Sequence, residues 1–259
     1  MAPLKLGVIG VGGRMGRAIL ELALQDPHVR LAALLEAPGS AAVGETQNGF
    51  RVTDDVAASL PGVDALIDFT APAASVAHAA LAARGSVPIV IGTTGVDEGG
   101  RKALAEAARR IPVVFSPNMS LSANVLFDAA ERMAALLPDY DAEILETHHS
   151  RKKDAPSGTA QRLADAVQRG RKAGRFVYGR QGLVGERKKD EIGVHAVRGG
   201  DVVGDHTVLF LGNGERIELV HRVTSRTAFA AGALAAAKWV IGKPAGLYDM
   251  RDVLGLNKA

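Results

Sequence analysis

The sequence predicts an α/β protein in which a parallel sheet covered by helices is followed by an α+β region with a mixed sheet. In the first half, short apolar runs alternate with alanine-rich or amphipathic stretches, as a parallel sheet buried on both faces requires. After about residue 118 this alternation stops. The predicted strands of the first half are LKLGVIG, RLAALLE, DALIDFT, VPIVIGTTG and IPVVFSPN, and the predicted helices are RMGRAILELALQ, AASVAHAALAARG and DEGGRKALAEAARR.

The helices are predicted from the spacing of their apolar residues. In the first helix, Met15, Ile19, Leu22 and Ala23 recur at helical spacing and share one face. In the second half, an Asn-Gly pair between two β-rich runs predicts a hairpin turn. The elements predicted there are a helix over 121–138, a strand over 140–149, a helix from 157 to about 169, strands between 192 and 224 with the hairpin around Asn213 and Gly214, a helix over 226–242 and the tail 246–256.

The composition predicts a soluble, cytoplasmic protein. The 259 residues, 47% of them hydrophobic, suffice for one large or two modest domains. The absence of cysteine excludes disulfides and cysteine-ligated metals, and it agrees with a reducing compartment. The N-terminal MAPLKLGVIGVGG reaches glycine too early for a signal peptide, and no apolar run approaches the roughly 18 to 20 residues of a membrane span. We therefore expect no membrane partner.

The positive charge of the chain is local. The net charge of +3 is too weak to indicate nucleic-acid binding. Between Arg169 and Lys189, however, eight Lys or Arg residues accompany one Glu and five glycines. This stretch predicts a solvated, mobile loop. A nucleic-acid surface is the alternative, and it is disfavoured because only Phe176 and Tyr178 could stack on bases there.

The segment GVIGVGGRMG places a glycine-rich turn between a predicted strand and a predicted helix. In that context glycines let the backbone approach a pyrophosphate, and the helix N-terminus receives its charge. The strict G-x-G-x-x-G spacing fails because residue 15 is Met; Gly10, Gly13 and Gly16 follow G-x-x-G-x-x-G instead. The turn alone is a weak signal, since such turns also serve packing.

Three further features favour a Rossmann-type dinucleotide site. Glu36 stands at the end of the second strand, where a carboxylate accepts hydrogen bonds from an adenosine ribose and repels the 2′-phosphate of NADP. No Arg follows it, because residue 37 is Ala, although Arg14 could reach a phosphate. GTTG (92–95) and SPNMS (116–120) follow two other strands, at the sheet edge where ligands bind. Each is alternatively a simple helix cap.

The segment ETHHSRKKDAPSGTA, residues 146–160, gathers groups suited to proton transfer and anion binding. His148 and His149 adjoin each other at a strand end, and Lys152 follows closely. Ser157 is placed to cap a helix whose first amides form a carboxylate or phosphate site. Metal binding is disfavoured, because the neighbouring cations repel a divalent ion. Structural roles are predicted for the remaining histidines, His28, His78, His195, His206 and His221.

The sequence resembles a known family over nearly its whole length. The matching segments are HHSRKKDAPSGTA, GVGGRMG, IDFT, VIGTTG and GLYDMRDVLGL. They resemble the 4-hydroxy-tetrahydrodipicolinate reductases of bacterial lysine and diaminopimelate synthesis, formerly called dihydrodipicolinate reductases. The pattern E-x-H-H-x-x-K-x-D-A-P-S-G-T-A carries the resemblance, because it is far more specific than the glycine turn.

The resemblance implies reduction of a cyclic, dicarboxylated imine by NADH or NADPH, with loss of water. By position, it implies that His148 donates and accepts a proton and that Lys152 donates one. His149 is implied as a substrate contact, and Gly158 with Thr159 as a carboxylate cradle. The implied cofactor contacts are Gly10, Val11, Gly12, Gly13, Arg14, Met15, Glu36, Gly92, Thr93, Thr94, Ser116, Pro117, Asn118 and Met119.

The resemblance also implies a domain arrangement and an assembly. Residues 1–119 and 228–259 are expected to form the dinucleotide-binding domain, and residues 120–227 a substrate-binding domain whose sheet builds a homotetramer. Some family members carry Arg after the ribose-binding acid, where this chain has Ala37. We therefore expect NADH to be preferred over NADPH. Two alternatives remain: another nicotinamide-dependent dehydrogenase of an amino-acid precursor, and a non-catalytic NAD(P)-binding regulator.

Overall fold

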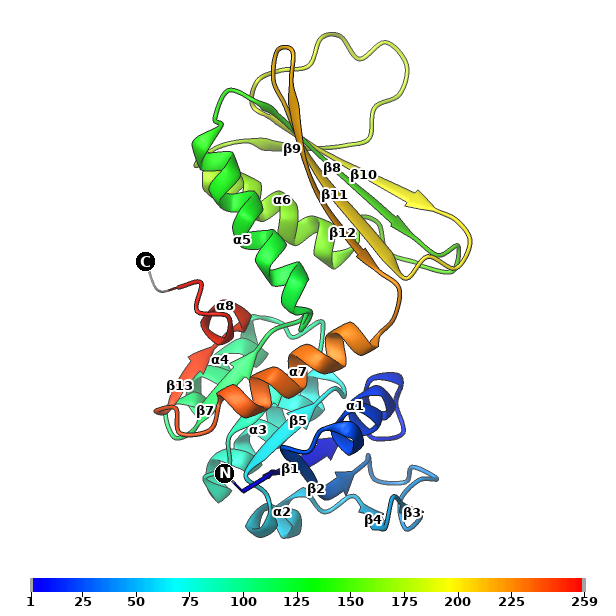
Figure 1. Ribbon diagram of the computed structural model, residues 1–259, viewed down its shortest axis with the longest axis vertical. Helices are drawn as coiled ribbons and strands as arrows, with labels where there is room; N and C mark the ends of the chain where they lie inside the picture. The colour runs from blue at the N-terminus through cyan, green and yellow to red at the C-terminus, as the bar shows by residue number, and fades with distance from the viewer. Residues whose placement is uncertain (1, 258–259) are drawn as a thin grey trace. The chain divides into compact units, whose positions relative to one another are not determined.

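The computed structural model describes residues 2–257, which divide into two compact units (Figure 1). The first unit comprises the chain up to Leu121 and from Arg226 onward, and the second runs from Ser122 to Ser225. The first unit contains β1 (Leu4–Ile9), α1 (Arg14–Gln25), β2 (Val29–Leu35), β3 (Thr46–Gln47), β4 (Phe50–Thr53), α2 (Val56–Ser59), the 3-10 helix η1 (Leu60–Gly62), β5 (Ala65–Asp68), α3 (Pro72–Gly85), β6 (Ile89–Ile91), α4 (Glu98–Ala108), β7 (Pro112–Phe115), α7 (Thr227–Trp239), β13 (Gly246–Tyr248) and α8 (Met250–Val253). The second unit contains α5 (Leu121–Leu136), which begins at the boundary, β8 (Asp141–His148), α6 (Gly158–Arg171), β9 (Arg175–Tyr178), β10 (Glu191–Arg198), β11 (Gly204–Leu211) and β12 (Arg216–Val223).

The sheet of the first unit confirms the predicted Rossmann-type fold. Its strand order is β13-β7-β6-β5-β1-β2-β4-β3, and every pair except β3 with β4 is parallel. The central order reverses between β1 and β5, the arrangement in which dinucleotides bind beyond the carboxyl ends of the strands. The strands, turns and helices that the sequence places in this half lie at the predicted positions, and α1 has the predicted bounds.

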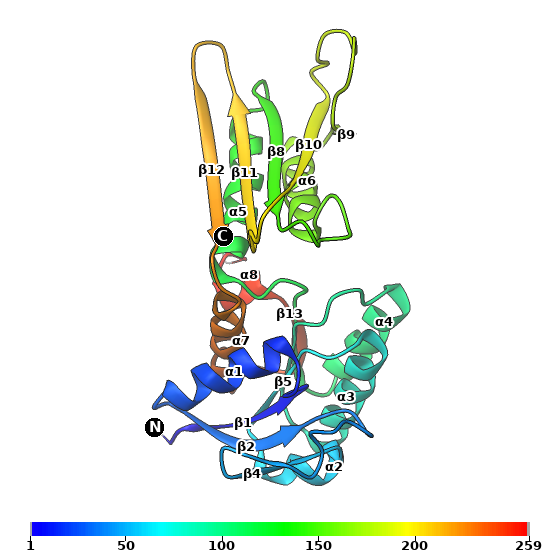
Figure 2. The same cartoon turned by 90° about the vertical axis from the view of Figure 1, so that its right-hand side faces the viewer.

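Helices cover both faces of this sheet, as Figure 2 shows. Helices α1 and α7 pack on one face, where Ile19 and Ala233 join a buried cluster with Val8. Helices α3 and α4 pack on the other, where Ala82 and Leu104 meet strand residues of the opposite parity. The near-continuous apolar strands follow from this burial on two faces. None of the helices formed by residues 2–257 combines the length and apolar character needed to cross a membrane.

The second unit is a mixed sheet covered by helices on one face. Its strand order is β12-β11-β8-β10-β9; β8, β10 and β9 run parallel, and β11 is antiparallel to both β8 and β12. The predicted hairpin is present as β11 and β12, with Gly214 at a φ of 84° in the turn. Helices α5 and α6 lie together on one side of the sheet (Figures 1 and 2).

The alternation of side chains along β8 separates two groups of residues. Ala142 and Ile144 belong to the core shared with α5 and α6, so Glu146 and His148, at the same parity, are directed to the helix-covered face. Glu143, at the other parity, is directed to the opposite face. Each face therefore receives one buried glutamate of β8.

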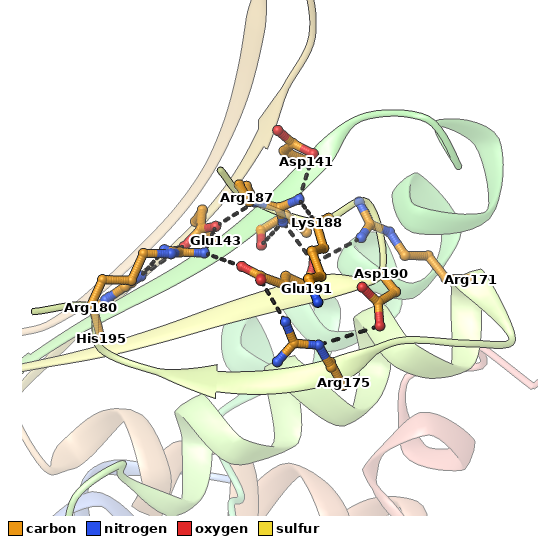
Figure 3. Close-up of polar contacts among 11 residues, drawn as sticks. Asp141, Glu143, Arg171, Arg175, Arg180, Arg187, Lys188, Asp190, Glu191 and His195 are labelled. Atoms are coloured by element: carbon orange, nitrogen blue, oxygen red, sulfur yellow. Dashed lines mark hydrogen bonds and ion pairs between the residues drawn. The ribbon is translucent and has the colours of Figure 1, made fainter. Parts of the chain in front are cut away.

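The prediction of a solvated, mobile loop between Arg169 and Lys189 is wrong for part of that stretch. Helix α6 continues to Arg171, and β9 pairs with β10 in parallel. Three arginines that follow helix α6 bind acidic residues of the sheet, as Figure 3 shows. The sequence does not reveal these contacts because β9 pairs with β10 across a glycine-rich connection that has no apolar pattern of its own. The arginines are Arg175, Arg180 and Arg187.

Candidate active site

The glycine turn after β1 has the geometry that the sequence predicts for a phosphate-binding loop. Gly10 adopts a φ of 86°, and its carbonyl accepts the amide of Gly13 at 3.0 Å. A Cβ on Gly16 would collide with the carbonyl oxygen of Gly10. The backbone path of the turn therefore requires glycine at positions 10 and 16, whereas a Cβ on Gly13 would only approach the Gly10 carbonyl oxygen at 3.2 Å.

The N-terminus of α1 fits an anionic ligand. Its N-cap residue, Gly13, provides no side-chain cap. The amides of Arg14 and Met15 belong to the first turn of the helix, whose N–H groups have no carbonyl partner within the helix. Together with the helix dipole, these amides are the kind of donors that a pyrophosphate requires. A dinucleotide therefore fits this turn by the chemistry of its donors.

Glu36 lies beside the glycine turn, one residue after β2. Its Oε2 accepts the amide of Gly12 at 2.7 Å, and its Oε1 accepts the amide of Ala37 at 2.9 Å. These two bonds fix a carboxylate at the strand end, where a ribose is bound in sheets of this kind. The side chain of Val11 is buried in the core and anchors the glycine turn there.

The two other predicted turns lie at the ends of β6 and β7, on the same sheet edge as Gly10. Gly92 packs against the ring of Phe69, which a side chain there would overlap. The Thr93 hydroxyl is buried, accepts the amide of Thr70 at 3.1 Å and lies 2.7 Å from the Ser75 hydroxyl. Thr93 therefore serves a polar network inside the unit, whereas Thr94 is exposed.

The turn after β7 likewise combines internal and exposed groups. The Ser116 hydroxyl donates to the carbonyl of Asn118 at 2.8 Å, and the side-chain oxygen of Asn118 accepts the amide of Ser120 at 2.9 Å. Met119 is 1% exposed and packs in the core beneath α7. Pro117 is exposed. A ligand at this turn would therefore meet backbone groups and Pro117 rather than the side chain of Met119.

In the second unit, His148 is held by a carboxylate that the sequence did not single out. Its Nδ1 lies 2.5 Å from Oε2 of Glu146, and both side chains are almost completely buried. Arg198 of β10 donates to both oxygens of Glu146, at 2.8 Å each. These donors lower the pKa of Glu146 against the opposing effect of its burial. Glu146 is therefore an ionised carboxylate inside the protein.

The pKa of His148 is lowered, and burial of the ring is the main cause. Glu146 opposes this effect, because the carboxylate favours the imidazolium, while the charges of Lys152 and Arg198 add to it. The buried ring therefore favours its neutral form more than a free imidazole does. The backbone after it is fixed by the β10–β11 connection, since the His149 amide donates to Val202 at 2.8 Å.

The helix that follows begins beside this histidine. The Ser157 hydroxyl accepts the amide of Ala160 at 3.1 Å, which confirms the predicted cap. Gly158 is exposed and has open space where a side chain would stand, and Thr159 follows it. Lys152 reaches both oxygens of Asp154, at 2.9 and 3.0 Å. The loop thus brings a cation and an open helix N-terminus close to His148.

Two histidines for which the sequence predicts structural roles lie behind this site. His206 and His221 occupy opposed positions on β11 and β12, and the His206 ring contacts His148 edge-on, with centroids 5.2 Å apart. His206 Nε2 lies 3.2 Å from the Ser157 hydroxyl, and burial lowers the pKa of His206 to about 3. His206 is therefore a neutral side chain that packs His148 against the helix start.

No group of three or more His, Asp or Glu residues in the part of the chain that the structure describes is arranged to hold a metal ion.

Comparisons with known proteins agree on one family. The family model described as "Dihydrodipicolinate reductase, N-terminus" matches residues 4–119, and the model described as "Dihydrodipicolinate reductase, C-terminus" matches residues 122–254. The chain belongs to the dihydrodipicolinate reductase family. The resemblance read from the sequence is thereby confirmed.

Relatives and solved structures support the same family. The chain is 52% identical to the 4-hydroxy-tetrahydrodipicolinate reductase of Thiobacillus denitrificans, over 98% of this chain and 99% of that one. It is 48% identical to the enzyme of the same name from Dechloromonas aromatica, over 99% of this chain and 100% of that one. A dipicolinate-bound dihydrodipicolinate reductase from Paenisporosarcina sp. TG-14 shares the fold, with a TM-score of 0.80 and 23% identity over 95% of this chain and 97% of that one.

Sequence reasoning missed three side chains of this family member that contact the predicted site. Glu146 stood inside the recognised motif, and its spacing of two from His148 on a strand places both on one face. That parity was the signal available for it. Arg198 and His206 reach the site from β10 and β11, and nothing in the local sequence of either strand indicates this.

Proposed function

We propose that this chain reduces 4-hydroxy-tetrahydrodipicolinate to tetrahydrodipicolinate, with release of water, in lysine and diaminopimelate biosynthesis. The relatives that are about half identical over the whole chain carry the name of this activity. The observation that carries the proposal is the pairing of buried His148 with ionised Glu146 beside an open helix N-terminus. A dicarboxylated substrate that must be protonated needs both features.

His148 and Lys152 are the proton-transfer groups of this proposal. Because His148 uses Nδ1 to bind Glu146, its other ring nitrogen is left to exchange a proton with the substrate. Lys152 is a primary ammonium, 19% exposed, on the loop that follows. Its ion pair with Asp154, which is 62% exposed, is weak enough to yield to a substrate carboxylate.

The substrate carboxylates are received by the start of α6 and by His149. The amides of Gly158 and Thr159 lie at the N-terminus of α6, where the helix dipole is positive. Gly158 is exposed, and its lack of a side chain leaves room for a ligand. The Nδ1 atom of His149 is buried and has no hydrogen-bond partner among residues 2–257. A carboxylate oxygen would satisfy it.

The nicotinamide cofactor, when bound, supplies the hydride. The residues proposed to hold it are those at the carboxyl edge of the first sheet: the turn from Gly10 to Met15, Glu36, the turn from Gly92 to Thr94, and the turn from Ser116 to Met119. NADH is proposed as the preferred form. The carboxylate of Glu36, fixed by two backbone amides, repels a 2′-phosphate, and Ala37 brings no compensating cation.

The remaining proposals concern organisation. Residues 1–119 with 228–259 would hold the dinucleotide, and residues 120–227 would bind substrate and form a homotetramer in the cytoplasm. The helix-free face of the second sheet supports such an assembly, because Leu145, Val197 and Val220 lie on it and are 37%, 49% and 46% exposed. Apolar residues on an uncovered sheet face favour burial against another copy.

The test is oxidation of NADH and of NADPH by the purified chain, with substrate made in situ by the synthase that precedes this step. We expect substrate-dependent oxidation, with kcat/KM several-fold higher for NADH. Protein that binds NADH but oxidises neither cofactor with this substrate would contradict the reaction. Oxidation with a different amino-acid precursor only would instead support the alternative dehydrogenase. Equal or higher kcat/KM with NADPH would contradict the NADH preference alone.

A further inference from the structure

Glu146 accepts hydrogen bonds from three different segments of the second unit. His148 Nδ1 lies 2.5 Å from Oε2, and the backbone amide of Ser157 donates to Oε1 at 3.0 Å. Arg198 places one guanidinium nitrogen on each oxygen, at 2.8 Å. The Glu146 side chain is 0% exposed. This carboxylate is therefore solvated entirely by the protein, and every partner that the structure gives it is a donor.

These partners belong to the two halves of the proposed active site. His148 is the proton-transfer group, whereas Ser157 is the residue that caps α6 and precedes the amides proposed to bind a carboxylate. Glu146 is the point at which the two are joined. The Arg198 fork holds the carboxylate in one plane and neutralises its charge.

We infer that Glu146 is a positioning residue for the proposed reaction: it fixes the His148 ring in one tautomer and holds the start of α6 in register with that ring. The inference rests on the proposed function and deepens it, since neither the motif nor the family membership assigns this residue a task. Both oxygens of Glu146 are occupied by protein donors, so the residue acts through these partners.

The tautomer follows from the charge of the acceptor. An ionised carboxylate can only accept, so the His148 nitrogen that faces it must carry the hydrogen. In the neutral ring, the lone pair is then on Nε2. Gly204 leaves space beside this atom, because a Cβ at that position would lie 3.0 Å from Nε2. Glu146 therefore directs the proton-exchanging nitrogen towards the side on which β11 carries no side chain.

The charges around His148 give the expected pH effect of removing Glu146. The groups that face the pair are Arg198 from β10, neutral His206 from β11, and Lys152 with Asp154 from the loop. Of the groups closest to the ring, Glu146 is the one that favours its protonated form, while burial, Lys152 and Arg198 oppose it. Replacing the carboxylate by an amide would lower the pKa of His148 further.

The test compares Glu146→Gln with Glu143→Gln. Both replace a buried glutamate of β8 that binds an arginine and a histidine, but Glu143 lies on the opposite face of the sheet. We expect Glu146→Gln to lower kcat by about tenfold or more, to raise KM for the dicarboxylate, and to shift the acid limb of the kcat profile to lower pH. Glu143→Gln is expected to keep all three at the wild-type values.

Two outcomes would overturn the inference. One is a Glu146→Gln enzyme with wild-type kcat, KM and pH profile. The other comes from nitrogen NMR of the wild-type protein, with the His148 signals assigned through a His148→Gln variant: a neutral His148 carrying its hydrogen on Nε2 would exclude the proposed tautomer. We expect the hydrogen on Nδ1. The NMR measurement remains decisive if the glutamine variant does not fold.

The NMR result also separates this inference from the proposed function. A wild-type protein that shows the Nδ1–H tautomer but does not reduce the substrate would contradict the reaction and leave the Glu146 geometry intact. Activity together with the wrong tautomer would contradict the positioning role alone. Glu146→Asp keeps the charge on a shorter side chain. Compared with Glu146→Gln, it is expected to bring the pH profile closer to that of wild type, while kcat stays lower than in wild type.

Discussion

Glu143 and Glu146 lie three residues apart on β8 and therefore point to opposite faces of the second unit's sheet. Each is buried, each receives both terminal nitrogens of an arginine, and each contacts a histidine nitrogen. The arginine and histidine are Arg180 and His195 for Glu143 (Figure 3), and Arg198 and His148 for Glu146. One strand thus carries two copies of the same ionic arrangement.

The two arrangements differ in their remaining donor. For Glu146 it is the backbone amide of Ser157, at the start of a helix whose first residue, Gly158, is exposed and has open space where a side chain would stand. For Glu143 it is the guanidinium of Arg187, at 2.9 Å, which also binds Asp141 at 2.5 Å. Glu143 is surrounded by cations from residues 179–190, the segment between β9 and β10, and no helix N-terminus is among the donors that the structure describes for it.

This difference separates an ionic centre that positions reactive groups from one that anchors a segment. A buried glutamate, an arginine fork and a histidine do not by themselves define a catalytic site. Around Glu143 the same residues fasten the chain between β9 and β10 to the sheet, and Gly193 leaves the room that the carboxylate occupies. Around Glu146 they act on His148, the residue proposed to transfer protons.

Replacing the two histidines gives the largest expected contrast. His148→Gln removes the proposed proton-transfer group and should lower kcat by roughly a hundredfold, the usual scale for losing a general acid or base. His195→Gln removes the equivalent partner of Glu143 and should leave kcat within about twofold of wild type. Steady-state kinetics with NADH checks both. Comparable losses of kcat in the two variants would show that the faces are not functionally distinct.

The part of the site that could be predicted from the sequence is the part formed by neighbours in the chain. His148, Lys152 and the α6 cap follow one another within a dozen residues, and the glycine turn follows directly from β1 into α1. The partners of the two glutamates come from far along the chain: Arg198 is 52 residues from Glu146, and Arg180 is 37 residues from Glu143. They meet only because β8, β10 and β9 pair in one register, which brings the segment between β9 and β10 to the sheet.

The same reason explains why the sequence does not reveal the ion pairs of the basic stretch between Arg169 and Lys189. Its eight cations and five glycines have the composition of a loop, and local propensity contains no information about Glu143, Asp141 or Glu191. The fold was easier to predict, because the strands of the first unit are buried on both faces and carry a strong apolar signal. A buried charge pair has no such periodic pattern.

Glu143→Gln tests the anchoring role and has the next largest effect. The arginines and His195 lower the pKa of Glu143 from 4.5 to about 2, although its burial acts in the opposite direction. The resulting stabilisation is present above pH 4.5 and is lost as the pH falls towards 2, because the unfolded chain then binds the proton more readily.

The free energy of unfolding of this variant should therefore be about 2 kcal/mol lower than that of wild type at neutral pH, since two guanidinium groups lose an ionised acceptor. Its acid unfolding should be shallower than that of wild type over the same pH range. Denaturant unfolding at several pH values measures both quantities, and hydrogen exchange should show faster exchange between Gly179 and Asp190. Unchanged exchange there, with unchanged stability, would contradict the anchoring role.

Arg175→Lys is expected to have the smallest effect. It tests whether the ion pairs of Arg175 contribute to stability as those around Glu143 do. Arg175 contacts Glu191 at 2.6 Å and Asp190 at 3.4 Å, but its side chain is 50% exposed. Solvent screens such a pair, so the free energy of unfolding should fall by no more than about 0.5 kcal/mol. Arg180→Lys is the matched comparison, because Arg180 is 29% exposed and binds both Glu143 and Glu191. Equal losses of stability in the two variants would show that the ion pairs of Arg175 and Arg180 act as one network. A larger loss for Arg180→Lys would show that the ion pair with Glu143 holds the segment between β9 and β10.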